Sequence, residues 1–326
     1  MNISLFEKLH ADGIITEASL LKVEAGSAKQ LFSLQWELKT FIYLGVLLLS
    51  GGIGILIYNN IDTIGHQVIL LLIAAISAGC FIYCFKKKLP FSTEKCVSPN
   101  SFFDYILLLG CLTFISFVRY LQFQYNVYGN RYGLATFIPM LVLFLSAYYF
   151  DHIGILSLAI TNFATWAGIA ITPLKILKTN DFNSNTIIIT GLTLGVILIC
   201  AGILTERKKL KTHFEFTYTN FGTHMLFISC LAAMFYFEQF YLWWFITLTA
   251  ISYVFYQKAI KEKSFYFLLI VSLYFYIGLS AVVIRLLFDA ANLDMAGIYL
   301  AFIYFLASAI SFIFFLMKMN KKIKTV

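Results

Sequence analysis

The stretch from Phe41 to Tyr58, FIYLGVLLLSGGIGILIY, contains no charged side chain. At about 1.5 Å of rise per residue, a helix of this length comes close to the thickness of a bilayer's hydrocarbon core, about 30 Å. Polar residues follow at once, and the same alternation of a long apolar run and a short polar break continues along the chain. The sequence therefore predicts an all-α, polytopic helical membrane protein.

Composition agrees with this prediction and limits the class of partner. Hydrophobic residues make up 60% of the 326 residues and charged residues only 12%, whereas soluble domains have about half and about a quarter. The net charge of +8 could indicate nucleic-acid binding, but the basic residues lie between the apolar runs. That placement is typical of topology signals and of contacts with anionic head groups. We therefore expect the lipid bilayer and a membrane protein as partners, and no nucleic acid.

The residues that usually carry catalysis or hold metals form no recognisable pattern. The six cysteines are scattered, and no CxxC pair or Cys/His cluster is present in the sequence. The sequence also lacks GxSxG, HExxH and phosphate-binding glycine-loop motifs. We therefore expect neither a metal nor a cofactor, and we do not expect an enzyme.

Ten apolar segments give the domain organisation. A polar preface, residues 1–39, precedes them; residues 40–174 form a first transmembrane half, and residues 186–326 a second half with a basic tail. The predicted helices lie near 41–58, 67–85, 102–121, 132–150, 153–172, 186–204, 221–237, 240–256, 264–287 and 296–317. The fourth and fifth segments are separated only by Asp151 and His152.

The preface reads as two or three short amphipathic helices. Within LFEKLHADGIITEASL, Gly13 suits the residue that follows a helix C-terminus, and Thr16 with Ser19 can cap the next turn. Such helices are too short to be stable alone in water, so we expect them to form on the membrane surface or on cytoplasmic connections. The first apolar run is expected to act as its own insertion signal.

The lysines and arginines predict which connections face the cytoplasm. If the segments alternate in direction, 19 of the 24 basic residues fall in one set of connections and termini and five in the other. The richer set includes the preface, the connection after the second segment, the connection after the sixth and the tail. By the positive-inside rule these regions are cytoplasmic, so both termini are predicted inside.

The N-terminal pattern resembles a known family. The preface LFEKLHADGIITEASL, a tryptophan, and then YLGVLLLSGGIGILIYNN with Asp62 are similar to the bacterial predicted membrane proteins grouped as domain of unknown function 2157. In that family the first span typically ends in Asn-Trp-Asp; here Asn60 and Asp62 match, and Ile61 replaces the tryptophan. The resemblance covers about the first 150 residues. It implies a multi-pass protein of the bacterial inner membrane and no established activity.

Polar residues at helix ends and at mid-depth are the candidate ligand-binding groups. On the predicted outer face, mixed charges near the end of the first span could form a pocket for a polar ligand, although solvated helix ends are the simpler explanation. Asn162, one turn before Trp166 in the fifth segment, could line a polar cavity or make an interhelical hydrogen bond beside the Pro139 kink. The candidate ligand-binding residues are Asn59, Asn60, Asp62, Arg119, Asn162 and Arg285.

The sequence leaves two main functions open, and an intramembrane enzyme ranks third because no candidate catalytic groups are present. The first is a non-enzymatic scaffold or partner-binding membrane protein, favoured because no Asp, Glu, Lys or Arg lies near the middle of a segment. The alternative is a small-molecule transporter of the 5+5 inverted-repeat type. Residues 41–172 and 186–317 have equal lengths, and an odd number of spans per half would invert the second half.

Overall fold

The computed structural model describes residue 6 and residues 9–19, 35–59, 65–96, 98–100, 102–129, 131–171, 185–290 and 295–325. It divides into two compact units, Met1–Gly65 and His66–Val326, each of which is considered by itself. All regular secondary structure in the described residues is helical. The all-α prediction is therefore confirmed for them.

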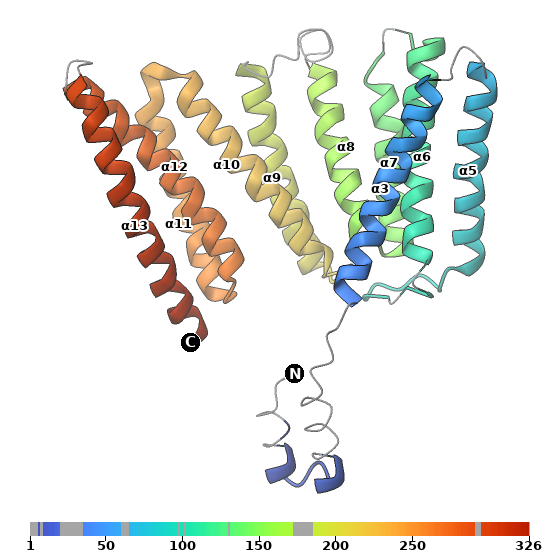
Figure 1. The fold of residues 1–326 in the computed structure, drawn as a ribbon, viewed down its shortest axis with the longest axis horizontal. Coiled ribbons are helices and arrows are strands. Elements are labelled where there is room, and N and C mark those ends of the chain that lie inside the picture. Colours follow the sequence, from blue (N-terminus) through green and yellow to red (C-terminus); the bar gives the residue numbers. More distant parts are fainter. Residues whose placement is uncertain are drawn as a thin grey trace. The chain divides into compact units, whose positions relative to one another are not determined.

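A helix coincides with most of each of the ten predicted apolar segments (Figure 1). The first unit holds α3 (Gln35–Asn59). The second unit holds α5 (His66–Lys87), α6 (Phe103–Tyr125), α7 (Leu134–Phe150), α8 (Ile153–Ile171), α9 (Asn185–Arg207), α10 (Phe214–Tyr236), the 3₁₀ turn η2 (Glu238–Phe240), α11 (Tyr241–Lys261), α12 (Phe265–Ala290) and α13 (Met295–Thr325). The last helix runs beyond its predicted end at 317 into the basic tail.

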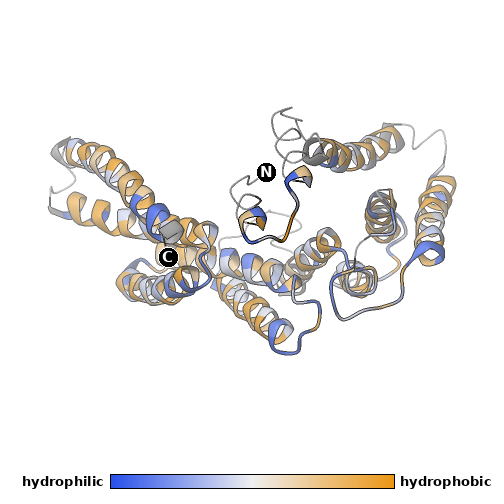
Figure 2. Ribbon diagram, turned by 90° about the horizontal axis from the view of Figure 1, so that it is seen from below, coloured by the Kyte–Doolittle hydropathy of each residue, from blue (hydrophilic) through white to orange (hydrophobic). Residues whose placement is uncertain are grey.

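The helices differ in their ability to cross a bilayer. Six helices of the described residues are long and apolar enough, and α10 with α11 adds a seventh candidate if this pair, bent by 108° at its break, counts as one broken span. The helices α7 and α8 are apolar but shorter. Hydrophobic residues dominate along the helices of the second unit, and hydrophilic residues gather at their ends and connections (Figure 2). The structure thus supports several spans, while ten crossings and the inside location of both termini stay predictions.

Helices of the second unit pack mainly against their neighbours in sequence. The pairs α5–α6, α7–α8, α9–α10 and α11–α12 form hairpins, and the helices of residues 66–171 meet those of residues 185–325 mainly where α8 packs against α9 and α10. A first core includes Leu107, Leu143 and Ile155, all fully buried. Two further cores lie among α10, α11 and α12, and among α11, α12 and α13.

The α9–α10 hairpin owes its closeness to glycine. A Cβ atom built on Gly195 would lie 2.9 Å from the backbone nitrogen of Leu226, and one on Gly222 would lie 3.0 Å from the backbone nitrogen of Ile199. Because real Cβ atoms hardly ever come this close to backbone, only glycine lets the two helix backbones approach as they do. Small residues at helix interfaces are the usual means of tight packing in membranes, where lipid tails remove the hydrophobic drive between helices.

In the first unit, the described part of the preface ends a helical turn as predicted. Gly13 has a φ of +69°, its N–H donates to the carbonyl of His10 at 3.0 Å, and the N–H of Ile14 donates to the carbonyl of Leu9 at 2.9 Å. This is the hydrogen-bond pattern of a helix C-cap, in which glycine takes the left-handed position without a Cβ penalty. The hydroxyls of Thr16 and Ser19 hydrogen-bond each other across the start of the next turn.

Candidate functional site

The site begins at the tight turn between α7 and α8, where Asp151 ends one helix and His152 precedes the next. Asp151 has φ 58° and ψ 48°, and its N–H donates to the carbonyl of Ala147. Aspartate and asparagine tolerate this left-handed conformation better than most residues. The turn therefore reverses the chain within two residues and leaves the carboxylate of Asp151 pointing into the protein.

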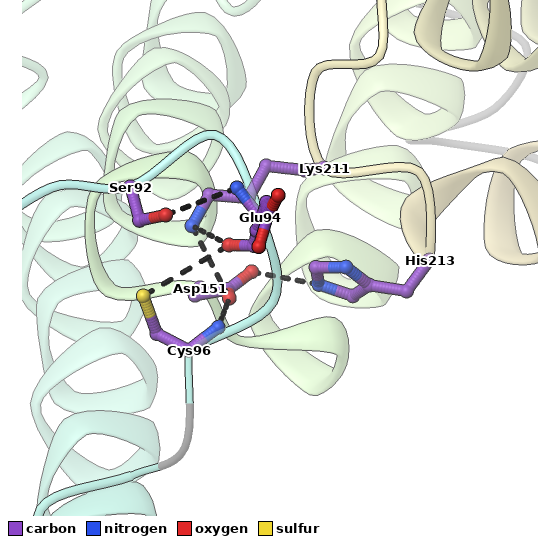
Figure 3. A network of polar contacts seen from close by, with 6 residues as sticks. All are labelled: Ser92, Glu94, Cys96, Asp151, Lys211 and His213. Carbon is purple, nitrogen blue, oxygen red and sulfur yellow. Dashed lines mark hydrogen bonds and ion pairs between the residues drawn. The ribbon is translucent and has the colours of Figure 1, made fainter.

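That carboxylate is the centre of a buried polar network (Figure 3). Its Oδ2 accepts a hydrogen bond from the backbone N–H of Cys96 at 2.5 Å and lies 3.2 Å from Nζ of Lys211. Its Oδ1 lies 2.7 Å from Nε2 of His213. The side chains of Asp151 and Lys211 are only 3% and 1% exposed. Two opposite charges are thus held together out of water, where each without the other would be costly.

Lys211 also joins the α5–α6 connection to the network. Its backbone N–H donates to the carbonyl of Thr93 at 2.8 Å, and its Nζ lies 3.4 Å from the carbonyl oxygen of Glu94. The ammonium also lies 5.3 Å from the ring centre of Phe91, within the range of a cation–π contact. The α5–α6 connection, the α7–α8 turn and the α9–α10 turn are consequently joined by one pair of charges.

His213 leaves one polar atom of the network open. Its Nε2 bonds Asp151, whereas its Nδ1 is buried without a hydrogen-bond partner. The ring packs edge-on against Phe214, with centroids 4.6 Å apart. A neutral His213 that donates from Nε2 keeps an unused lone pair on Nδ1, and a protonated one keeps an unused N–H there.

His152 holds the start of α8. Its Nδ1 accepts from the N–H of Ile155 at 3.2 Å, so this nitrogen carries no proton. Its Nε2 lies 3.9 Å from Oδ1 of Asp104, which accepts from the hydroxyl of Ser98 at 2.6 Å. Burial lowers the pKa of His152 below its ordinary value, and the nearby charges of Asp104 and Asp151 oppose that shift only in part. The ring is therefore neutral near pH 7.

The lowered pKa of His152 predicts that acid destabilises the fold. Because the pKa of His152 is lower in the folded than in the unfolded chain, the unfolded chain takes up the proton first as the pH falls below about 6.5. The contribution of neutral His152 to stability is complete above that pH and is lost below it. In thermal unfolding between pH 7.5 and pH 5, we expect His152→Asn to reduce the acid-induced loss of Tm, since asparagine can still cap α8. An equal loss in wild type and variant would contradict the prediction.

The network itself leaves no room for a substrate. The cavity beside Asp151, Lys211 and Cys96 has a volume of about 20 Å³, which is enough for about one water molecule. Both carboxylate oxygens of Asp151 are occupied by donors from the protein. The arrangement can therefore fix the relative positions of three connections, but it cannot enclose a small organic molecule.

The ligand-binding residues expected from sequence are spread over separate helices. Asn60 and Asp62 lie outside the described residues, as does the side chain of Asn59. Arg119 is exposed on α6, and the guanidinium of Arg285 on α12 lies 4.7 Å from the ring centre of Tyr241. No hydrogen bond or ion pair in the described part of the chain joins two of these candidates. A shared pocket for them stays a prediction.

Asn162 is buried in α8, as a mid-depth polar candidate should be. Its Nδ2 donates to the carbonyl of Leu158 in its own helix at 3.1 Å, and its Oδ1 is buried without a partner. One turn later Trp166 packs against Phe137 and Phe163. The interhelical hydrogen bond that the sequence suggested as an explanation is therefore not made by the amide's oxygen.

The network residues were not among the sequence candidates. Asp151 looked like a break in an apolar run, and Lys211 looked like one of four clustered topology signals. The available signal was an acidic residue in a two-residue break between apolar helices. It did not by itself indicate burial, because Glu238, in the similar break between α10 and α11, is exposed. No feature of the sequence indicated that the partner would come from the α9–α10 turn.

Several helices are able to cross a bilayer, and a buried ion pair joins their polar connections at one end. These features define an integral membrane protein with several candidate spans. Residues 7–156 match the model of the family described as "Predicted membrane protein (DUF2157)", which confirms the resemblance seen in the N-terminal pattern. The matched region extends from the preface into the start of α8. Comparison with curated proteins and with solved structures finds no match to the chain.

Proposed function

We propose that this protein is a non-enzymatic scaffold of the bacterial inner membrane, which presents a rigid basic face to a partner protein on the cytoplasmic side. The observation that carries the proposal is the Asp151–Lys211 pair. Burying two charges rarely adds stability compared with apolar packing, but it can specify one arrangement of the groups around it. Here that arrangement is the relative position of three connections at one end of the second unit.

The face fixed in this way is strongly basic. The end of α5 and the connection after it contribute four exposed lysines, and the end of α9 with the turn after it contributes three exposed cations. Exposed acidic residues in the same segments are Glu94 and Glu206. The exposed basic residues are Lys86, Lys87, Lys88, Lys95, Arg207, Lys208 and Lys209. Such a surface favours a partner with an acidic docking segment, because complementary charge steers association and fixes orientation.

The same observations support the scaffold over its alternatives. An acid–base catalyst needs a group free to exchange protons with a substrate. Both carboxylate oxygens of Asp151 are already paired, one with Lys211 and the other with His213. A 5+5 transporter needs a wet cavity shared by its halves. Where the halves meet, α8, α9 and α10 surround a cavity of about 150 Å³ whose walls are mainly apolar, including Ile160, Leu194 and Met225.

A photocrosslinking amino acid placed at exposed positions tests the proposal. At Lys209, in the α9–α10 turn, we expect a discrete protein adduct in living cells that mass spectrometry identifies as one partner. The matched control is Arg131, an exposed cation in the α6–α7 connection, at the other end of α6 and α7 from the network. It should give no such adduct.

Two outcomes would count against the scaffold. If both positions form adducts with lipid alone, the basic face would serve only to set the topology of the protein in the membrane. If proteoliposomes containing the protein take up a solute, and Asp151→Asn does not change the rate of uptake, the transporter function would be favoured.

A further inference from the structure

A large groove lies among α11, α12 and α13, far along the chain from the network. Its volume is about 650 Å³, within the range of about 300–1,000 Å³ usual for small-molecule sites. The helix α13 bridges it: the hydroxyl of Tyr276 bonds that of Ser308 at 2.9 Å, the hydroxyls of Ser280 and Tyr304 are 3.0 Å apart, and Tyr256 reaches Met319. The first two contacts hold α13 on α12, and the third joins α11 to α13.

The groove is mainly apolar, and Ser252 in its wall has a buried hydroxyl without a hydrogen bond. Several hydroxyls in its wall are already bonded to their own helices, among them Thr249 to the carbonyl of Phe245 at 2.8 Å and Ser311 to the carbonyl of Ala307 at 2.8 Å. Ser252 differs, because its residue is only 7% exposed and its Oγ is buried without a partner. A buried hydroxyl without a hydrogen bond is unfavourable. It can be satisfied by a ligand in the groove that it lines.

Three properties of the wall define that ligand. The lining residues carry no charge, so the ligand is neutral; they include the aromatic rings of Phe275, Tyr276 and Phe312, which favour a flat ring as neighbour. The candidate spans α12 and α13 form two of its walls, so the bilayer itself is the source of the ligand. The lining segment of α12, from Val271 to Leu279, is about 12 Å long at 1.5 Å per residue, which leaves room for an apolar tail beside a ring.

We propose that this groove binds a lipid quinone, meaning a flat ring with carbonyl groups on an apolar tail, and that the Ser252 hydroxyl donates a hydrogen bond to one carbonyl oxygen. The ring lies among the aromatic side chains, and the tail follows the groove between α12 and α13. This binding function is separate from the basic face. Either can fail without the other.

Radiolabelled decylubiquinone, added to the full-length protein in lipid nanodiscs, tests the proposal. We expect saturable binding of about one molecule per chain that unlabelled decylubiquinone displaces. Decylbenzene, which has the ring and the tail but no carbonyl, should displace it poorly. Ser252→Ala should weaken binding by about threefold to tenfold, the effect of losing one hydrogen bond.

Two variants separate the ligand contact from general damage. Thr247→Ala removes from α11 a hydroxyl that lies outside the groove and is already bonded within its helix, and binding should stay at the wild-type level. Ala307→Trp fills the groove from an exposed position and should abolish binding while leaving the core untouched. The proposal is overturned if saturable binding is absent, if Ser252→Ala binds as wild type, or if decylbenzene competes equally. The last result would identify a groove for any apolar chain.

Discussion

Replacing Asp151 with asparagine is expected to lower the free energy of unfolding by about 3–5 kcal/mol, the usual cost of leaving one partner of a buried ion pair alone. Asparagine accepts the left-handed backbone of this turn and can still receive the N–H of Cys96. The loss therefore reports on the ammonium of Lys211, which stays 1% exposed with no carboxylate beside it. Thermal unfolding in lipid nanodiscs measures the effect.

A second substitution should restore most of that stability. In the double variant Asp151→Asn with Lys211→Met, the buried cation is gone and an apolar chain of similar length takes its place, and such replacements are often neutral or better. The control pair is Lys258 with Glu215, 3.0 Å apart but 30% and 22% exposed. There Glu215→Gln should cost about 0–1 kcal/mol, because water already screens the charges. Equal losses at both pairs, or no recovery in the double variant, would show that Asp151 is not paired as described.

The second large effect is expected at the α9–α10 contact. Gly195→Val places side-chain atoms where the backbone nitrogen of Leu226 lies 2.9 Å from the position of a Cβ. Backbone cannot rotate away as a flexible side chain can, so the helices must separate. Overpacking of this kind costs about 1–3 kcal/mol, and we expect the upper end of that range because α9 and α10 form the most extensive helix pairing in the second unit.

The matched control is the same change in α5. A Cβ built on Gly79 has no atom within 4 Å, so Gly79→Val should leave the melting temperature of the purified protein within a few degrees of wild type. If both valine variants unfold alike, the glycine contact does not hold α9 to α10.

Much of the helix pattern was predictable because it depends on local information. Apolar runs bounded by polar breaks marked the ten long helices of the described residues, since a chain in lipid must satisfy its backbone hydrogen bonds within each segment. The C-cap at Gly13 was predictable for a similar reason: a residue in the left-handed region is most often glycine. The N-terminal pattern also identified the family whose model matches residues 7–156.

The number of membrane crossings was harder to predict from the sequence. Hydropathy treated α7, α8, α10 and α11 as four separate spans. In the structure α7 and α8 are short, and α10 meets α11 at a bend of 108°. Segment length and the direction of the next helix decide whether an apolar helix crosses alone, and the direction is set by packing.

By itself the sequence determined that this chain lies in a membrane, where its helices run and which of its connections are basic. The tertiary structure alone decided which of those helices touch and which charges meet. Every helix in a bilayer has the same apolar surroundings, so hydropathy cannot select partners. Which helices pack together is decided by shape, as at Gly195 and Gly222, and by buried polar groups that need a partner. Asp151, for example, pairs with Lys211 from another connection. The unpaired hydroxyl of Ser252 becomes visible in the same way, only once α12 and α13 stand beside it.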